Sequence, residues 1–347
     1  EGLTASEFGR GPDGLGRAPQ SHEHMEPGSF LLHALGSTLV LDPGYLSFGE
    51  HDRVLAGPDH NLVLVDGQGP EPMLANSLRW LGDPAGPPPQ DGFATIHATL
   101  DTDRLDTAAV TTRYGPPGRE ILLTRRFLFV DDAYLVVADE ITPLGSVPVT
   151  LDWALHGNGG GTSGGTHTPG PAGGTWTHGD ARLSSAIVTT AGPPDLRSVE
   201  DEHEAPHRRG LELTHTAQYA SVTATGPVRA LQVLVPSPVA DAPPAITTST
   251  SAAGIEVAVA GRSGVRRATV RWAGDRLEVL DTDATGADPV AFASGPSVAA
   301  AGVEHVTPGA SFVTLAATAT GGWELGAVEP AHDSHLGGPV AVGSVHG

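Results

Sequence analysis

The chain has 347 residues, enough for one large β domain or two smaller ones with a sizeable core. Its formal net charge is −21 and all 19 basic residues are arginine, so it lacks the basic face that non-specific nucleic-acid binding needs. It has no cysteine, which excludes disulfides and thiolate sites. No run approaches the ~18 apolar residues of a membrane span.

Residues 1–20 are punctuated by glycine and proline, and we interpret them as a lead-in from a preceding region. The chain begins at Glu1 without a methionine or a signal peptide, which indicates a processed or trimmed piece of a longer protein. In "GSFLLHALGSTLVLDPG" two apolar runs broken at Gly36 predict a hairpin, and "HNLVLVDGQGP" predicts a strand that ends at an Asp-Gly turn.

Alternating segments continue along the chain. "REILLTRRFLFVDDAYLVVADEI" predicts two strands joined across Asp131-Asp132, and "VTLDWALHG" predicts another. Residues 71–82 are a possible short helix, and residues 157–174 are interpreted as a long flexible glycine-rich loop. Many short strands with turn signals predict an all-β sandwich with few or no helices, over residues 21–347. A smaller C-terminal β subdomain from about residue 245 is a further option.

The stretch "SHEHMEPGSF" places His22 and His24 two residues apart, so both would face one side of an extended segment. Asp42 ends the second arm of the predicted hairpin, and His60 opens the following strand. Side chains at strand ends can converge on a rim. Two imidazoles and a carboxylate with an open fourth position are a plausible Zn²⁺ site, although a His-x-His pair in a solvated loop remains the alternative.

"GRGPDGLGRAPQSHEHMEPGSFLLHALGSTLVLDPG", "HNLVLVDGQ" and "RRFLFVDDAYLVVADEI" occur in the order and spacing of a known family. The chain here resembles the C-terminal β domain of the heparinase II/III-like polysaccharide lyases, over residues 8 to about 156. Two positions depart from the family pattern. Glu26 stands where the family has Asp, and Leu62 stands where it has Thr or Ser.

The resemblance implies that His24, Asp42 and His60 bind a zinc ion, with calcium the less favoured metal, and that His22 is the active-site histidine. It implies that the fold is an antiparallel two-layer β super-sandwich. It implies β-elimination on an acidic, uronic-acid-containing polysaccharide. It also implies that the catalytic tyrosine and an asparagine or histidine lie on an N-terminal α/α toroid, which would precede residue 1 as a cleaved fragment or a separate chain. Tyr45, three residues after Asp42, is a further catalytic candidate by analogy.

Arg125 and His156 are candidate substrate contacts, because arginine suits bidentate carboxylate binding and His156 ends a strand beside the glycine-rich loop. His203 and His207, in "EDEHEAPHRR", are interpreted as part of a solvated charged loop.

Three functions follow as hypotheses. The first is the β-sandwich half of a secreted or periplasmic, bacterial polysaccharide lyase with a structural zinc. The second is a non-catalytic, metal-stabilised β-sandwich that binds carbohydrate or a partner chain. The third, a glycoside hydrolase, would need a pair of carboxylates that the sequence does not show. Neither nucleic acid nor a membrane is an expected partner, and homo-oligomerisation is left open.

Overall fold

The computed structural model describes residues 24, 26–46, 51–70, 94–100, 105–206, 208–262, 266–274, 276–282, 290–300, 303–317 and 323–330. Over these residues the chain is nearly all strand, with one four-residue helix, α1 (His51–Val54), and one 3₁₀ turn, η1 (Gly57–Asp59). Every strand pairing is antiparallel, which confirms the predicted all-β class. In the described ranges no helix has the length and apolarity to cross a membrane.

Sheet A has six strands among the described residues. Its strand order is β1 (Leu32–Ala34), β2 (Ser37–Val40), β8 (Val149–Gly157), β13 (Glu212–Ala224) and β12 (Asp195–Glu204), and β3 (Val63–Val65) also pairs with β8. The predicted hairpin around Gly36 is β1–β2, and Leu35 and Gly36 have φ of 53° and 76°. Two consecutive positive φ values are typical of a type I′ hairpin turn.

Sheet B has the order β4 (Ala94–Leu100), β5 (Leu105–Tyr114), β6 (Ile121–Val130), β7 (Tyr134–Pro143), β14 (Val228–Pro238), β11 (Ala181–Thr189), β10 (Gly174–His178) and β9 (Thr166–Pro169). The predicted turn at Asp131-Asp132 connects β6 and β7, and both aspartates have positive φ. Aspartate tolerates this backbone better than most residues, which explains its use at both positions.

Sheet C contains the remaining strands in sequence order: β15 (Ala245–Ser251), β16 (Gly254–Arg262), β17 (Arg266–Ala273), β18 (Arg276–Thr282), β19 (Val290–Ala300), β20 (Val303–Ala317) and β21 (Trp323–Pro330). Sheet C begins at Ala245, and the sequence offered a smaller C-terminal β subdomain from about residue 245. That this sheet forms an independent unit stays a prediction.

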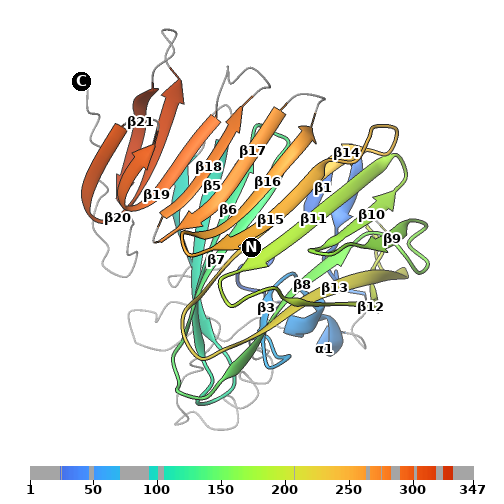
Figure 1. Ribbon diagram of the computed structural model, residues 1–347. Helices are drawn as coiled ribbons and strands as arrows, with labels where there is room; N and C mark the ends of the chain where they lie inside the picture. The colour runs from blue at the N-terminus through green and yellow to red at the C-terminus, as the bar shows by residue number, and fades with distance from the viewer. Residues whose placement is uncertain are drawn as a thin grey trace, which may run out of the picture.

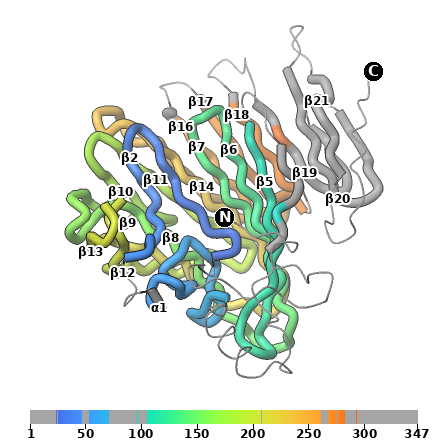
Figure 2. The backbone as a smooth tube through the Cα atoms, turned by 180° about the vertical axis from the view of Figure 1, so that it is seen from behind, coloured from blue at the N-terminus to red at the C-terminus, as the bar shows by residue number. Residues whose placement is uncertain are grey.

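The three sheets form three layers, where two were expected. One apolar cluster joins sheet B to sheet C and includes Val136, Val233 and Val270. Two others join sheet B to sheet A and include Trp153, Ile141 and Trp176. Figure 1 shows the orange strands of sheet C in front of the cyan strands of sheet B, and Figure 2 shows the orange strands from behind, with the cyan strands in front of them. The middle layer needs strands that are apolar on both faces. The continuous apolar runs of β7 and β14 supply them, and their residues are buried without alternation.

The glycine-rich segment 157–174 contains more regular structure than predicted. β9 lies inside it and pairs with β10, so the prediction of one long flexible loop was wrong over residues 166–169. Gly157 is the last residue of β8. An added Cβ there would lie 2.4 Å from the Trp176 ring, so the position requires glycine. The possible helix at residues 71–82 lies outside the described residues.

Candidate functional site

His60 is the centre of the first cluster, and its side chain is fully buried. It follows η1, and its Nε2 lies 3.0 Å from the backbone oxygen of Val54. A carbonyl can only accept, so Nε2 carries a hydrogen, and Nδ1 is the atom left to take a proton or a metal ion. Nδ1 faces two carboxylates, with Oε2 of Glu26 at 3.3 Å and Oδ2 of Asp42 at 3.7 Å.

His24 completes this cluster from the segment before β1. Its ring packs edge-on against the His60 ring, with centroids 5.2 Å apart. One ligand atom from each of His24, Glu26 and His60 lies within 4.8 Å of the others. Two of the three residues proposed as metal ligands, His24 and His60, belong to this group, and Glu26 supplies its carboxylate. Asp42, the third, lies outside the group, and its carboxylate is farther from Nδ1 of His60 than that of Glu26 is. The metal role of His24, Asp42 and His60 stays a prediction.

The charges in this cluster call for a cation between the carboxylates. Burial disfavours a charged imidazole, but the carboxylates of Asp42 and Glu26 outweigh it and raise the pKa of His60 to about 9. Burial likewise opposes ionisation of Asp42, and His60 overcomes it and lowers the pKa of Asp42 to about 2. Either a proton on Nδ1 or a metal ion in its place would satisfy both acids. The donor set of two imidazoles and carboxylates suits Zn²⁺.

Arg125 lies inside the protein, beneath this cluster. Its Nε and Nη2 donate to the two carboxylate oxygens of Asp139 at 2.8 and 2.9 Å. Its Nη1 donates to the backbone oxygens of Gly28 and Asn61, at 2.9 and 2.8 Å. Gly28 lies two residues after Glu26, and Asn61 directly follows His60. Arg125 therefore fixes the two segments that carry the cluster. Its expected contact with substrate stays a prediction, and its 2 % side-chain exposure offers little surface for one.

Asn61 links the same segments from the other side. Its Nδ2 donates to the backbone oxygens of Phe30 and Leu41 at 2.8 and 2.7 Å, and its Oδ1 accepts from the backbone N–H of His156 at 2.8 Å. The residue is fully buried. It therefore joins the segment before β1, the end of β2 and the end of β8 at one point.

A second cluster lies on the outer face of the same end of sheet A. His156 on β8, Asp201 and His203 on β12, and His215 on β13 each place one ligand atom within 4.8 Å of the others. The strand register explains this convergence. Asp201 pairs with His215, and His156 pairs with the residue two beyond His215. Paired residues and residues two apart share a face, so all four side chains point the same way. Figure 1 shows α1 beside these strands.

The sequence analysis missed this cluster. His203 was interpreted as part of a solvated loop, but it belongs to β12 and is fully buried. The Asp-x-His spacing at 201–203 was a usable signal, since it places two ligand types on one face of a strand. His156 was expected to contact substrate, and instead its fully buried ring lies in this cluster. Its substrate role stays a prediction. His207 lies outside the described residues.

Of the two catalytic candidates, Tyr45 lies among the described residues and His22 does not. Tyr45 lies at the same end of sheet A, where its backbone N–H donates to Oε2 of Glu204 at 3.1 Å. The guanidinium of Arg209 lies 5.7 Å from its ring centroid. Its catalytic role stays a prediction. His22 lies outside the described residues, although His24 is placed beside His60.

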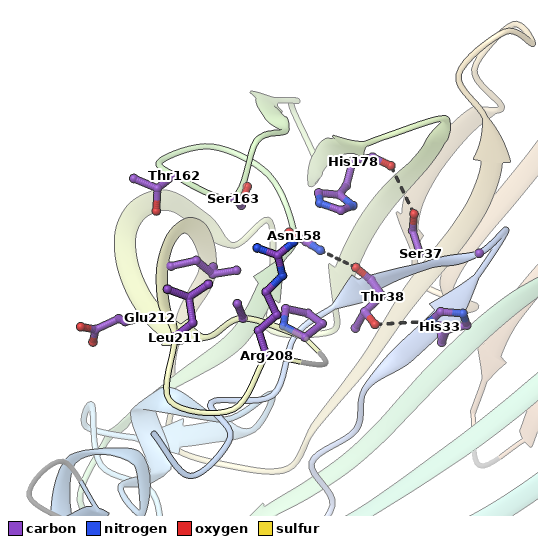
Figure 3. Close-up of a pocket in the computed structure, with 14 residues that line it drawn as sticks. His33, Ser37, Thr38, Asn158, Thr162, Ser163, His178, Arg208, Leu211 and Glu212 are labelled. Carbon is purple, nitrogen blue, oxygen red and sulfur yellow. Dashed lines mark hydrogen bonds between the residues drawn. The ribbon is translucent and has the colours of Figure 1, made fainter. Parts of the chain in front are cut away.

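A pocket of about 550 Å³ with a mixed polar and apolar lining opens beside the β1–β2 hairpin. Figure 3 shows hydroxyl, imidazole and amide groups from four segments around it, including His33, Thr38, Asn158 and His178. Nδ2 of Asn158 donates to the Thr38 backbone oxygen at 2.7 Å, which fixes the pocket wall. Arg208 and Glu212 add one charge of each sign to the rim.

These features define an antiparallel β-sandwich with two histidine–carboxylate clusters at one end of a sheet. The heparinase II/III-like C-terminal domain family matches residues 11–252. The chain therefore belongs to the heparinase II/III-like family.

Solved structures of lyases have a similar fold. A heparinase III, the BT4657 gene product, aligns with a TM-score of 0.55 and 12% identity over 78% of this chain. The heparan sulfate lyase HepC from Pedobacter heparinus aligns with a TM-score of 0.52 and 14% identity over 73% of this chain. This chain covers 36% and 37% of those two proteins, respectively. A search of curated proteins found no match.

Proposed function

We propose that this chain is the β-sandwich part of a polysaccharide lyase that cleaves a uronic-acid-containing polysaccharide by β-elimination, with a structural zinc at the His60 cluster. The observation that carries the proposal is the position of Nδ1 of His60, buried between the carboxylates of Glu26 and Asp42 and beside His24. Family membership supports the reaction class. The proposed location is secreted or periplasmic, where such polymers occur.

In the proposed β-elimination this chain would supply only part of the catalytic groups. In β-elimination the uronate carboxylate is neutralised, a base removes the C5 proton, and the 4-linked sugar leaves with a proton from a general acid. Charge neutralisation and positioned acid–base groups lower this barrier most. His22, two residues before His24, would neutralise the carboxylate or assist proton transfer, and Tyr45 is a weaker candidate for the same cleft. The remaining catalytic groups would come from an α/α toroid.

Zinc would supply a fixed positive charge that holds His24, Glu26, Asp42 and His60 together. Because Val54 fixes the His60 tautomer, Nδ1 is ready to bind without rearrangement. The segment that carries His22 would then be held at the rim of the sandwich. The task of the cluster would be positioning.

Metal content per chain tests the first half of the proposal. We expect zinc at the His60 cluster in the wild type and its loss in His60→Ala. His167→Gln is the matched control, since its imidazole lies in β9, outside both clusters. Equal zinc in the wild type and His60→Ala would contradict the assignment.

Lyase activity tests the second half. The chain expressed together with its α/α toroid is incubated with heparan sulfate, hyaluronan and alginate. Cleavage creates an unsaturated uronate that absorbs in the near ultraviolet. We expect absorbance to rise with one of these polymers and to be lost in His22→Ala. No product from any of them would contradict a lyase of this substrate class.

The pocket beside the β1–β2 hairpin favours a second candidate, a non-catalytic carbohydrate-binding β-sandwich. Its hydroxyl, amide and imidazole lining suits sugar hydroxyls, and Arg208 suits a uronate carboxylate. Calorimetric titration with uronate oligosaccharides would then show binding that Arg208→Ala weakens without changing zinc content. Such binding in the absence of any lyase product would favour this candidate over the first.

A further inference from the structure

Strand β12 is attached to sheet A in an unusual way. It is an edge strand, paired only with β13, and among its ten residues His203 alone is buried. Its remaining residues are exposed or half-buried, and Val199 is 38% exposed. Edge strands are normally held by apolar side chains on one face. On β12 the apolar contact with the core comes from the partly buried Leu196, and the fully buried side chain is the imidazole of His203.

Neither ring nitrogen of His203 has a hydrogen-bond partner among the described residues, although the side chain is fully buried. Nδ1 of His215 is buried without a partner as well. A buried polar atom left unsatisfied costs about 1–3 kcal/mol, and native structures contain few of them. Three such atoms in one cluster point to a bound species.

The geometry selects a cation. Nε2 of His156 lies 3.0 Å from the Pro58 backbone oxygen, so it carries the hydrogen and leaves the lone pair on Nδ1. That lone pair faces Nε2 of His215 and Oδ2 of Asp201, both at 3.3 Å. The stacked ring of His203 closes the cluster, with its centroid 4.6 Å from that of His156. The Pro58 carbonyl plays the part of the outer partner that orients most metal-binding histidines.

We propose that His156, Asp201, His203 and His215 form a second metal site, separate from the His60 cluster, that binds a divalent transition-metal ion. Three imidazole nitrogens and one carboxylate oxygen make a complete four-ligand set, which suits tetrahedral zinc. Because all four positions are filled by protein and the site is buried, the ion is structural. It joins β8, β12 and β13 at one end of sheet A.

The test is a titration of metal-free protein with Zn²⁺, followed by metal analysis of the dialysed product. We expect about two zinc ions per wild-type chain, about one in His203→Leu, and about one in His60→Ala. His167→Gln should retain two. Titration with Co²⁺ gives a second readout, since a tetrahedral site with nitrogen ligands produces visible absorption bands. His203→Leu should lose the bands of one site.

Separate variants keep the two metal sites distinguishable. One ion in the wild type that is lost in His60→Ala would overturn the second site and leave the proposed function intact. One ion that is lost in His203→Leu and kept in His60→Ala would support the second site and contradict the first. If His203→Leu fails to fold, the wild-type stoichiometry and the milder Asp201→Asn variant decide the question. A buried water in place of the ion would give one equivalent at most and no second set of Co²⁺ bands.

Discussion

The guanidinium of Arg125 and the carboxylate of Asp139 form a planar, two-bond ion pair in the interior, at 2.8 and 2.9 Å. The side chains are 2% and 1% exposed. Trp153 donates a further bond to Oδ2 of Asp139 from its indole nitrogen at 2.8 Å. This pair lies between sheets A and B and supports the loop that carries His60.

Arg125→Met should therefore lower the free energy of unfolding by about 3–5 kcal/mol, because it leaves the Asp139 carboxylate buried without its partner. Urea unfolding measures the change. The matched control is Arg271→Gln, which breaks a partly exposed ion pair with Glu278 and should cost less than about 1 kcal/mol. Equal losses in the two variants would contradict a structural role for Arg125.

Asn61→Leu should disrupt both clusters. It removes two donors and one acceptor that join three segments, and the orphaned backbone groups are buried. We expect a loss of about 3 kcal/mol in the free energy of unfolding. Zinc affinity should also fall at both sites, since His60 and His156 are held through this residue. If Asn61→Leu is destabilised but binds zinc at both sites with unchanged affinity, Asn61 does not position His60 and His156 for metal binding.

Gly157→Ala should destabilise the end of β8. The added methyl would lie 2.4 Å from the Trp176 ring, whose indole nitrogen is bonded to the Thr216 backbone oxygen at 2.8 Å. We expect a cost of about 2–3 kcal/mol, measured by thermal or urea unfolding. Gly226→Ala is the control, because nothing lies within 4 Å of its added methyl and its φ is not positive. A Gly157→Ala protein as stable as Gly226→Ala would show that the Trp176 ring moves freely.

His167 should make stability depend on pH. Burial lowers the pKa of His167 below its ordinary value of 6.5, and the ring packs on Trp176 with centroids 4.7 Å apart. The unfolded chain therefore binds a proton more readily than the folded one. The contribution of His167 to stability is present above pH 6.5 and is lost as the pH falls below it.

The measurement compares wild type with His167→Gln by urea unfolding between pH 7 and pH 5. The wild type should lose more stability over this range than the variant, while the other histidines contribute equally to both. Parallel pH profiles would contradict a depressed pKa at His167.

The sequence by itself determined the all-β class, the β1–β2 hairpin at Gly36 and the turn at Asp131-Asp132. These features depend on local rules, namely alternation, apolar runs and the few residues that accept positive φ. The His24, Asp42 and His60 candidates were also accessible, because the family pattern and the strand-end positions mark them.

Only the tertiary structure decided the number of layers, the place of Arg125 and the second cluster. The continuous apolar runs of β7 and β14 mark strands that are buried on both faces, but they do not say which sheets cover those faces. An arginine that follows a polar residue in a strand gives no sign that Asp139 lies opposite it. His156, Asp201, His203 and His215 come from three strands, and β9, β10 and β11 lie between the first of these and the other two along the chain. Only the register between β8, β13 and β12 places the four side chains on one face.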